Sequence, residues 1–179
     1  AMAAILGLDD ADVIAACREA ANIGVVEAVN FNAPAQVVIA GEAEAVQAAM
    51  KNATDKGAKR VLILPVSVPA HSSLMRPAAA QLADALEAIE FHQPLIPVVQ
   101  NVAACVEADS KAMRQALVSQ LYSPVKWVGT VEWLAAQDVT RVIECGPGKV
   151  LCGLNKRISK GLTCESLESS NSLAAALAV

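Results

Sequence analysis

Short apolar runs alternate, over the first seventy residues, with segments whose apolar positions recur every three or four residues. The runs have the length of strands and are bounded by Gly, Asn and Pro, which favour turns. The recurring positions indicate helices that bury one face. The expected strands are 2–8, 25–30, 36–40 and 60–65, and the expected helices lie at 10–23 and 44–55. This order of strand, helix, strand, strand, helix, strand predicts a split β-α-β, ferredoxin-like sheet.

From residue 69 onward the pattern changes to longer helical segments that alternate with isolated strands. The expected helices are 72–89, 109–121, 131–137 and one that starts at Lys149, and the expected strands are 95–99 and 139–145. Such alternation is typical of a parallel α/β sheet that is covered by helices. We therefore expect an α/β chain with a small ferredoxin-like subdomain at 1–68 and part of a larger, parallel subdomain at 69–179.

The chain is rich in apolar residues, which make up 55% of its 179 positions. Soluble domains average about 45–50%, so a membrane segment is the first explanation to test. The longest uncharged stretches, 61–75 and 91–106, contain prolines and are shorter than the ~20 residues that span a bilayer. Strands that are buried on both faces of a sheet explain the composition better, and no membrane partner is expected.

The net charge of −4 argues against a nucleic-acid partner, because such a partner requires a broad basic face. The basic residues nevertheless form two groups, one around position 60 and one between positions 146 and 164, where no acidic residue occurs. These groups are either solvated charges at helix ends or a surface for an acidic partner. In the second case the candidate partner-binding residues are Lys59, Arg60, Lys156 and Arg157.

Five cysteines are scattered along the chain without a Cys-x-x-Cys pair: Cys17, Cys105, Cys145, Cys152 and Cys164. An odd number without regular spacing predicts reduced thiols in a cytoplasmic protein, and neither a disulfide framework nor a zinc site. Only two histidines are present, so no metal site is expected.

His71 is the strongest candidate for proton transfer. It lies between the strand expected at 60–65 and the helix expected at 72–89, so a loop would expose its ring while both elements hold it still. A ring held in this way can act as a general base. The alternative is an ordinary loop histidine hydrogen-bonded to solvent, and spacing alone does not separate the two. The other histidine, His92, is expected to be structural.

Two polar turns also have both a structural and a chemical interpretation. Asn32 and Gln36 lie with Asn30 where two strands meet, and they either form the turn or line a cleft. Gly146-Pro147-Gly148 follows a strand and precedes a helix, where it either makes a sharp turn or holds an anion.

Three segments of the chain resemble segments that occur in the same order in the malonyl-CoA:acyl carrier protein transacylases of bacterial fatty acid synthesis. They are VNFNAPAQVVIAG at 29–41, LPVSVPAHSSLM at 64–75 and ECGPGKVL at 144–151. The resemblance runs from Ala1 to Val179 but covers only the C-terminal part of such an enzyme. The family's Gly-Gln-Gly segment, its Gly-His-Ser-Leu-Gly nucleophile turn and its carboxylate-binding arginine helix are absent, and no Gly-x-Ser-x-Gly occurs in the 179 residues.

The resemblance implies a fold and a set of site residues. In the family, a ferredoxin-like subdomain is inserted into a larger hydrolase-like parallel α/β subdomain, and this chain would hold the C-terminal part of the larger one. His71 matches the catalytic base that takes the proton of the nucleophilic serine. The main-chain carbonyl of Gln120 matches the group that orients this base. Asn32 and Gln36 match substrate-binding residues that line the cleft between the subdomains.

The implied reaction is the transfer of a malonyl group from malonyl-CoA to acyl carrier protein through a serine ester, without a metal or a prosthetic group. The whole enzyme would act as a monomer in the cytoplasm, and the chain alone, which lacks the nucleophile turn, is expected to be inactive. Strands that are central in the family would then lie at an edge, with apolar surface uncovered.

Two other functions stay open at this point. The ferredoxin-like subdomain and the basic groups would also suit a module that binds acyl carrier protein without catalysis. Cys145 is the last residue of the last expected strand and precedes a helix N-terminus, where a thiolate could act with His71 as an acyl hydrolase. The family has an aliphatic residue at the position of Cys145.

Overall fold

The computed structural model describes residues 1–177. Its contacts divide the chain into two compact units, the first from Ala1 to Thr130 and the second beginning at Val131. Helix α5 (Trp127–Ala136) starts in the first unit and continues into the second. The ferredoxin-like subdomain predicted at 1–68 lies wholly within the first unit, and the predicted boundary at 68 stays a prediction.

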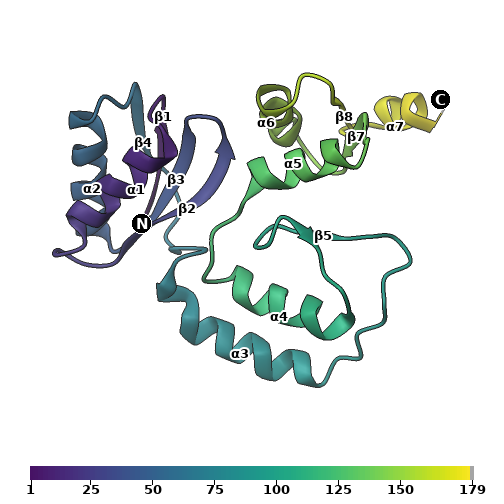
Figure 1. Ribbon diagram of the computed structural model, residues 1–179, viewed down its shortest axis with the longest axis horizontal. Coiled ribbons are helices and arrows are strands. Elements are labelled where there is room, and N and C mark those ends of the chain that lie inside the picture. The colour runs from purple at the N-terminus through teal and green to yellow at the C-terminus, as the bar shows by residue number, and fades with distance from the viewer. Residues whose placement is uncertain (178–179) are drawn as a thin grey trace. The chain divides into compact units, whose positions relative to one another are not determined.

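The first unit begins with an antiparallel four-stranded sheet whose strand order is β2-β3-β1-β4. Its strands are β1 (Met2–Leu6), β2 (Val26–Ala33), β3 (Gln36–Gly41) and β4 (Arg60–Ile63). Helices α1 (Asp10–Ala20) and α2 (Ala43–Asp55) pack against each other on one face of this sheet (Figure 1). The predicted β-α-β-β-α-β arrangement is confirmed.

The core of this subdomain forms where the sheet meets the two helices. Ile5 and Ile39 from the central strands pack with Val13 of α1 and Val46 of α2, and all four side chains are almost completely buried. Burying such a side chain contributes about 1.5–3 kcal/mol relative to leaving it exposed. The periodic apolar positions of the sequence therefore correspond to the face that each element buries.

The opposite face of the sheet carries a smaller apolar cluster, and the segment that leads to His71 packs against it. Val29 and Val38 are buried there, and Leu64 and Ala70 pack against them. The backbone N–H of Leu64 also donates to the carbonyl of Met2, at 2.9 Å. The segment after β4 is thus held against the sheet, and the loop that contains His71 follows directly from it.

The remainder of the first unit is built from short strands and two packed helices. Its elements are η1 (Ser73–Met75), α3 (Arg76–Glu87), β5 (Val99–Gln100), β6 (Cys105–Val106) and α4 (Ser110–Gln120). Asp109 caps α4 as predicted, since its side chain accepts the N–H of Ala112 at 2.8 Å. The helix predicted at 72–89 begins later, because a 3₁₀ turn precedes it and Pro77 lies in its first turn.

The strand predicted at 95–99 is wrong. The structure has only the two-residue β5 at its end, and the side chains of Leu95 and Ile96 are 101% and 76% exposed. Prolines at 94 and 97 remove two backbone donors from this segment, so it cannot form a regular ladder.

The second unit contains a parallel pair of strands joined by a helix. Strand β7 (Arg141–Glu144) pairs with β8 (Thr163–Ser166), and α6 (Val150–Ile158) connects them. Helix α7 (Ser170–Leu177) follows β8, and neither of these last two elements was predicted. The parallel pair fits the expected α/β class. The side chains of Ile63 on β4 and Ile143 on β7 are exposed. The expectation that strands central in the family lie at an edge here stays a prediction.

The prediction that all five cysteines are reduced thiols is wrong. Cys152 on α6 and Cys164 on β8 form a disulfide, with their Cα atoms 5.1 Å apart. The parallel crossover brings α6 back over β8, and this proximity is invisible in the linear spacing. Cys17, Cys105 and Cys145 are free. No helix in the described part of the chain is long and apolar enough to cross a bilayer.

Reduction of this disulfide is expected to lower the free energy of unfolding by roughly 2–3 kcal/mol, because the bridge closes a short loop in the unfolded chain. Denaturant unfolding with and without a phosphine reductant measures the difference. The double variant Cys152→Ser/Cys164→Ser is the control and should not respond to the reductant. Alkylation of all five cysteines in denaturant without reductant would contradict the bridge.

Candidate active site

His71 lies in a tightly held loop between β4 and η1. Its φ of +65° places it in the left-handed region, which a non-glycine residue adopts only when its surroundings impose it. The N–H of His71 donates to the carbonyl of Leu121, at 3.0 Å, and the buried hydroxyl of Ser72 donates to the carbonyl of Pro69, at 2.6 Å. These contacts therefore hold the backbone that carries the imidazole ring in one conformation.

The imidazole of His71 meets the main-chain carbonyl of Gln120, with Nδ1 and the oxygen 2.6 Å apart. A carbonyl only accepts hydrogen bonds, so Nδ1 must carry the proton, and in the neutral ring Nε2 is left with its lone pair. The structure thus brings together the two residues that sequence analysis assigned to the base and its orienting group.

The carbonyl of Gln120 is available for this contact because of the sequence that follows it. Gln120 is the last residue of α4, and the carbonyls of a helix's last turn have no partner within the helix. Four residues later stands Pro124, which has no N–H to offer. A proline four positions beyond a helix end is therefore a sequence signal for a free carbonyl.

A pocket of about 390 Å³ opens beside His71. Its lining combines apolar groups such as Phe31 with two charged side chains, Arg18 and Glu27. Cys17 also lines it, but burial and, to a smaller extent, the negative charge of Glu27 raise the pKa of this thiol to about 12. Cys17 therefore stays protonated at neutral pH and is no nucleophile.

Asn32 and Gln36 are not among the described residues that line this pocket. Asn32 lies near the end of β2 and Gln36 begins β3, and both side chains are half-buried at that end of the hairpin. Their role in substrate binding stays a prediction. A larger cavity of about 740 Å³ between α3 and α4 contains neither His71 nor Gln120.

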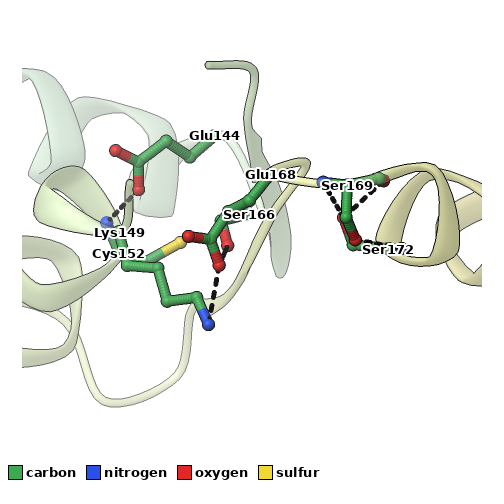
Figure 2. A network of polar contacts seen from close by, with 7 residues as sticks. All are labelled: Glu144, Lys149, Cys152, Ser166, Glu168, Ser169 and Ser172. Atoms are coloured by element: carbon green, nitrogen blue, oxygen red, sulfur yellow. Dashed lines mark hydrogen bonds and ion pairs between the residues drawn. The ribbon is translucent and has the colours of Figure 1, made fainter. Parts of the chain in front are cut away.

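Next to the turn at Gly146-Pro147-Gly148, a side chain of the protein caps the N-terminus of α6, and the choice between a sharp turn and an anion site stays open. The carboxylate of Glu144 accepts the N–H of Leu151 at 3.1 Å. It also accepts the N–H of Cys152 at 2.9 Å (Figure 2). The first turn of α6 is thereby capped from within, as the positive end of a helix dipole favours. Both glycines have positive φ, which suits a sharp turn.

Cys145 and His92 occupy exposed positions. The thiol of Cys145 is in the second unit, whereas His71 is in the first, and the pairing of the two stays a prediction. The side chain of His92 is 80% exposed and lies 3.8 Å from the carboxylate of Glu90, and the expectation that this residue is structural stays a prediction.

The chain has close relatives among known proteins, although no protein-family model matches it. It is 55% identical over 177 residues to the malonyl CoA-acyl carrier protein transacylase of Escherichia coli (strain K12), a match that covers 99% of this chain and 57% of that protein. It is 42% identical over 163 residues to the transacylase of the same name from Bacillus subtilis (strain 168). This match covers 90% of this chain and 51% of that protein.

Solved structures agree with these relatives. The malonyl-CoA:acyl carrier protein transacylase of Xanthomonas oryzae pv. oryzae superposes with a TM-score of 0.96 at 51% identity, over 99% of this chain and 56% of that chain. A malonyl-transacylase in complex with a type II PKS acyl-carrier protein superposes with a TM-score of 0.97 at 50% identity. The match covers 99% of this chain and 57% of that chain. Over 99% of its length, the chain is similar to malonyl-CoA:acyl carrier protein transacylases. It spans a little more than half the length of the relatives it matches.

The two basic groups of this chain lie in different units. Lys59 and Arg60 are exposed at the start of β4, whereas Lys156 and Arg157 are in the last turn of α6. Part of the basic charge around these groups is neutralised locally. Lys56 pairs with Glu19 at 2.7 Å, and Lys149 pairs with Glu168 at 2.7 Å (Figure 2). Their binding of a partner stays a prediction.

Sequence analysis of the chain missed Glu27. Its carboxylate accepts the backbone N–H of Ser73, at 2.7 Å, two residues beyond His71. The available signal was a single acidic residue within the apolar run VVEAV. An ionisable group in a half-buried strand requires a partner, but the sequence did not show which one.

Proposed function

We propose that this chain supplies the general base and its orienting carbonyl for malonyl transfer from malonyl-CoA to acyl carrier protein. The observation that carries the proposal is the 2.6 Å contact between His71 Nδ1 and the carbonyl of Gln120. It leaves Nε2 beside the pocket as a proton acceptor. The identity of 55% to a transacylase of that activity supports the choice of substrates.

The nucleophile is a serine of the whole enzyme that lies outside the 179 residues. In the first half-reaction, Nε2 of His71 takes the serine proton while the serine oxygen attacks the malonyl thioester carbonyl. The C–S bond then breaks, and the coenzyme A thiolate leaves with the proton held by His71. In the second half-reaction the phosphopantetheine thiol of acyl carrier protein gives its proton to His71 and attacks the malonyl-serine ester. The C–O bond to the serine then breaks, so that the malonyl group stays on the carrier sulfur, and the serine oxygen recovers the proton from His71.

The partner is an acidic carrier protein in this proposal, and Lys59, Arg60, Lys156 and Arg157 are its proposed contacts. A related malonyl-transacylase has been solved with an acyl-carrier protein, which supports the class of partner. Asn32 and Gln36 remain proposed substrate-binding residues. The whole enzyme is proposed to act as a monomer. Its location in the cytoplasm stays a prediction, and the Cys152–Cys164 disulfide removes the cysteine argument on which it was based.

A graft tests the proposed function. The matching 177 residues of the Escherichia coli relative are replaced by this chain, so that the relative contributes the remaining 43% of its own length, nucleophile segment included. The grafted enzyme is expected to transfer malonyl groups from malonyl-CoA to acyl carrier protein, whereas the 179-residue chain alone should not. A folded graft without transfer would overturn the proposal, and so would transfer by the chain alone.

A further inference from the structure

Glu27 connects the ferredoxin-like sheet to the loop that carries His71. It is the only acidic residue of β2, and its Oε2 accepts the N–H of Ser73 at 2.7 Å in a partly buried position. A hydrogen bond from a backbone N–H to a carboxylate is shorter and stronger than one between neutral groups. The chain directly after His71 is therefore fixed by a side chain that belongs to another element.

The same strand also fixes the segment that follows Gln120. The N–H of Phe31 donates to the carbonyl of Val125 at 2.9 Å, and the N–H of Val125 donates to the carbonyl of Val29 at 2.8 Å. These bonds form a parallel bridge between β2 and Val125, five residues beyond Gln120. One strand thus sets the positions of both partners of the histidine–carbonyl contact.

The conformation of the loop explains why these holding contacts from β2 are needed. A left-handed φ at a non-glycine residue such as His71 is strained and persists only where neighbouring contacts impose it. If the bond to Ser73 is lost, His71 can relax toward a commoner backbone conformation, which turns its ring away from the carbonyl. The Nδ1–H proton would then have no preferred acceptor.

We propose that Glu27 is a positioning residue for His71, because its hold on the Ser73 N–H keeps the imidazole Nδ1–H on the carbonyl of Gln120. The catalytic consequence of this inference rests on the proposed function, whereas its structural consequence does not. The two can therefore be measured separately.

The structural consequence is a change of tautomer in the 179-residue chain. Because only two histidines are present, a His92→Gln background leaves the ring of His71 as the single imidazole signal. Long-range ¹H–¹⁵N spectra of the neutral ring should show the Nδ1–H tautomer in this background. In Glu27→Ala the Nδ1–H tautomer is expected to lose its majority over the Nε2–H tautomer. Glu27→Gln keeps an acceptor oxygen, so the Nδ1–H tautomer should again predominate in that variant.

A second variant removes the same hydrogen bond from its other side. Ser73→Pro deletes the N–H donor at the first position of η1, where proline is tolerated, and the preceding Ser72 already has the extended backbone that a proline requires (ψ 164°). Ser73→Pro should change the tautomer as Glu27→Ala does. Combining the two should add little, since both remove one interaction.

Glu42→Ala is the matched control. Glu42 lines the same surface hollow as Glu27 and Ser73, but its carboxylate accepts the N–H of Val25 and does not hold the histidine loop. The tautomer should be unchanged in this variant. In the grafted enzyme, Glu27→Ala and Ser73→Pro should lower kcat by about 10–100-fold, as small misplacements of a catalytic group do, with KM little changed.

The outcomes separate the two proposals. An unchanged Nδ1–H tautomer in both Glu27→Ala and Ser73→Pro would overturn the role of Glu27, whatever the activity. If the unsubstituted graft fails to transfer malonyl groups, the proposed function fails, and the tautomer still decides the role of Glu27. Should Glu27→Ala not fold, Ser73→Pro gives the decision, because it leaves the carboxylate and the β2 core intact.

Discussion

Replacing His71 with alanine in the grafted enzyme is expected to lower the rate of malonyl transfer by about 10²–10⁴-fold, the usual contribution of a general base. Without the imidazole, the serine hydroxyl and the carrier thiol each lose the group that accepts their proton. The fold should be unchanged, because the loop is held by backbone contacts of residues 71 and 73 that alanine at 71 leaves in place.

The measurement is the initial rate of acyl carrier protein malonylation, together with a circular dichroism spectrum to confirm folding. His92→Ala is the control, since it removes the other histidine from an exposed loop and should leave the rate unchanged. Equal rates for the His71→Ala and unsubstituted grafts would exclude His71 as the base. A loss of rate accompanied by unfolding would say nothing about proton transfer, so the rate is interpreted only for a folded variant.

Ile5→Ala is expected to lower the free energy of unfolding by about 2–5 kcal/mol, because truncation of a buried isoleucine forfeits its burial and leaves a cavity. Ile5 has no exposed surface and lies on the central strand β1, packed against both helices. Since domains are stable by only about 5–15 kcal/mol, this single change removes a large part of the total.

Ile63→Ala makes the same chemical change in the same sheet and serves as its control. Ile63 is on the edge strand β4, and 57% of its surface is exposed. Its replacement should cost less than about 0.5 kcal/mol, as is usual for surface positions. Urea unfolding followed by circular dichroism gives both values. Equal losses at positions 5 and 63 would contradict a core centred on Ile5.

The ferredoxin-like sheet could be predicted because its information is local. Apolar runs of strand length, separated by Asn, Pro and Gly turns, specify the strands, and the acids at 9 and 10 specify the start of a helix. Asp109 indicated the start of α4 in the same way, and its side chain caps that helix. The strand predicted at 95–99 was wrong for a local reason too. Its apolar side chains favour a strand, but the prolines beside them prevent the hydrogen-bonded pairing that a strand requires.

The site was predictable only in part. His71 could be found from its place between a strand and a helix, and the contact with Gln120 came from resemblance to a family. A carbonyl leaves no mark in a sequence unless a feature such as Pro124 frees it. Glu27 was missed because its partner, the N–H of Ser73, lies 46 positions away. The disulfide was missed because the crossover through α6 brings two unremarkably spaced cysteines together.

By itself, then, the sequence determined the elements of the ferredoxin-like sheet, the faces that they bury and the resemblance to a transacylase family, since these depend on periodicity and on short motifs. Only the tertiary structure decided which of two nitrogens of His71 faces a carbonyl, which carboxylate holds its loop and which cysteines are bonded. These contacts join residues that are far apart in the chain, and their energies depend on distances of a few tenths of an ångström. A hydrogen bond forms only within a narrow range of distances and angles, and these are set when the elements pack.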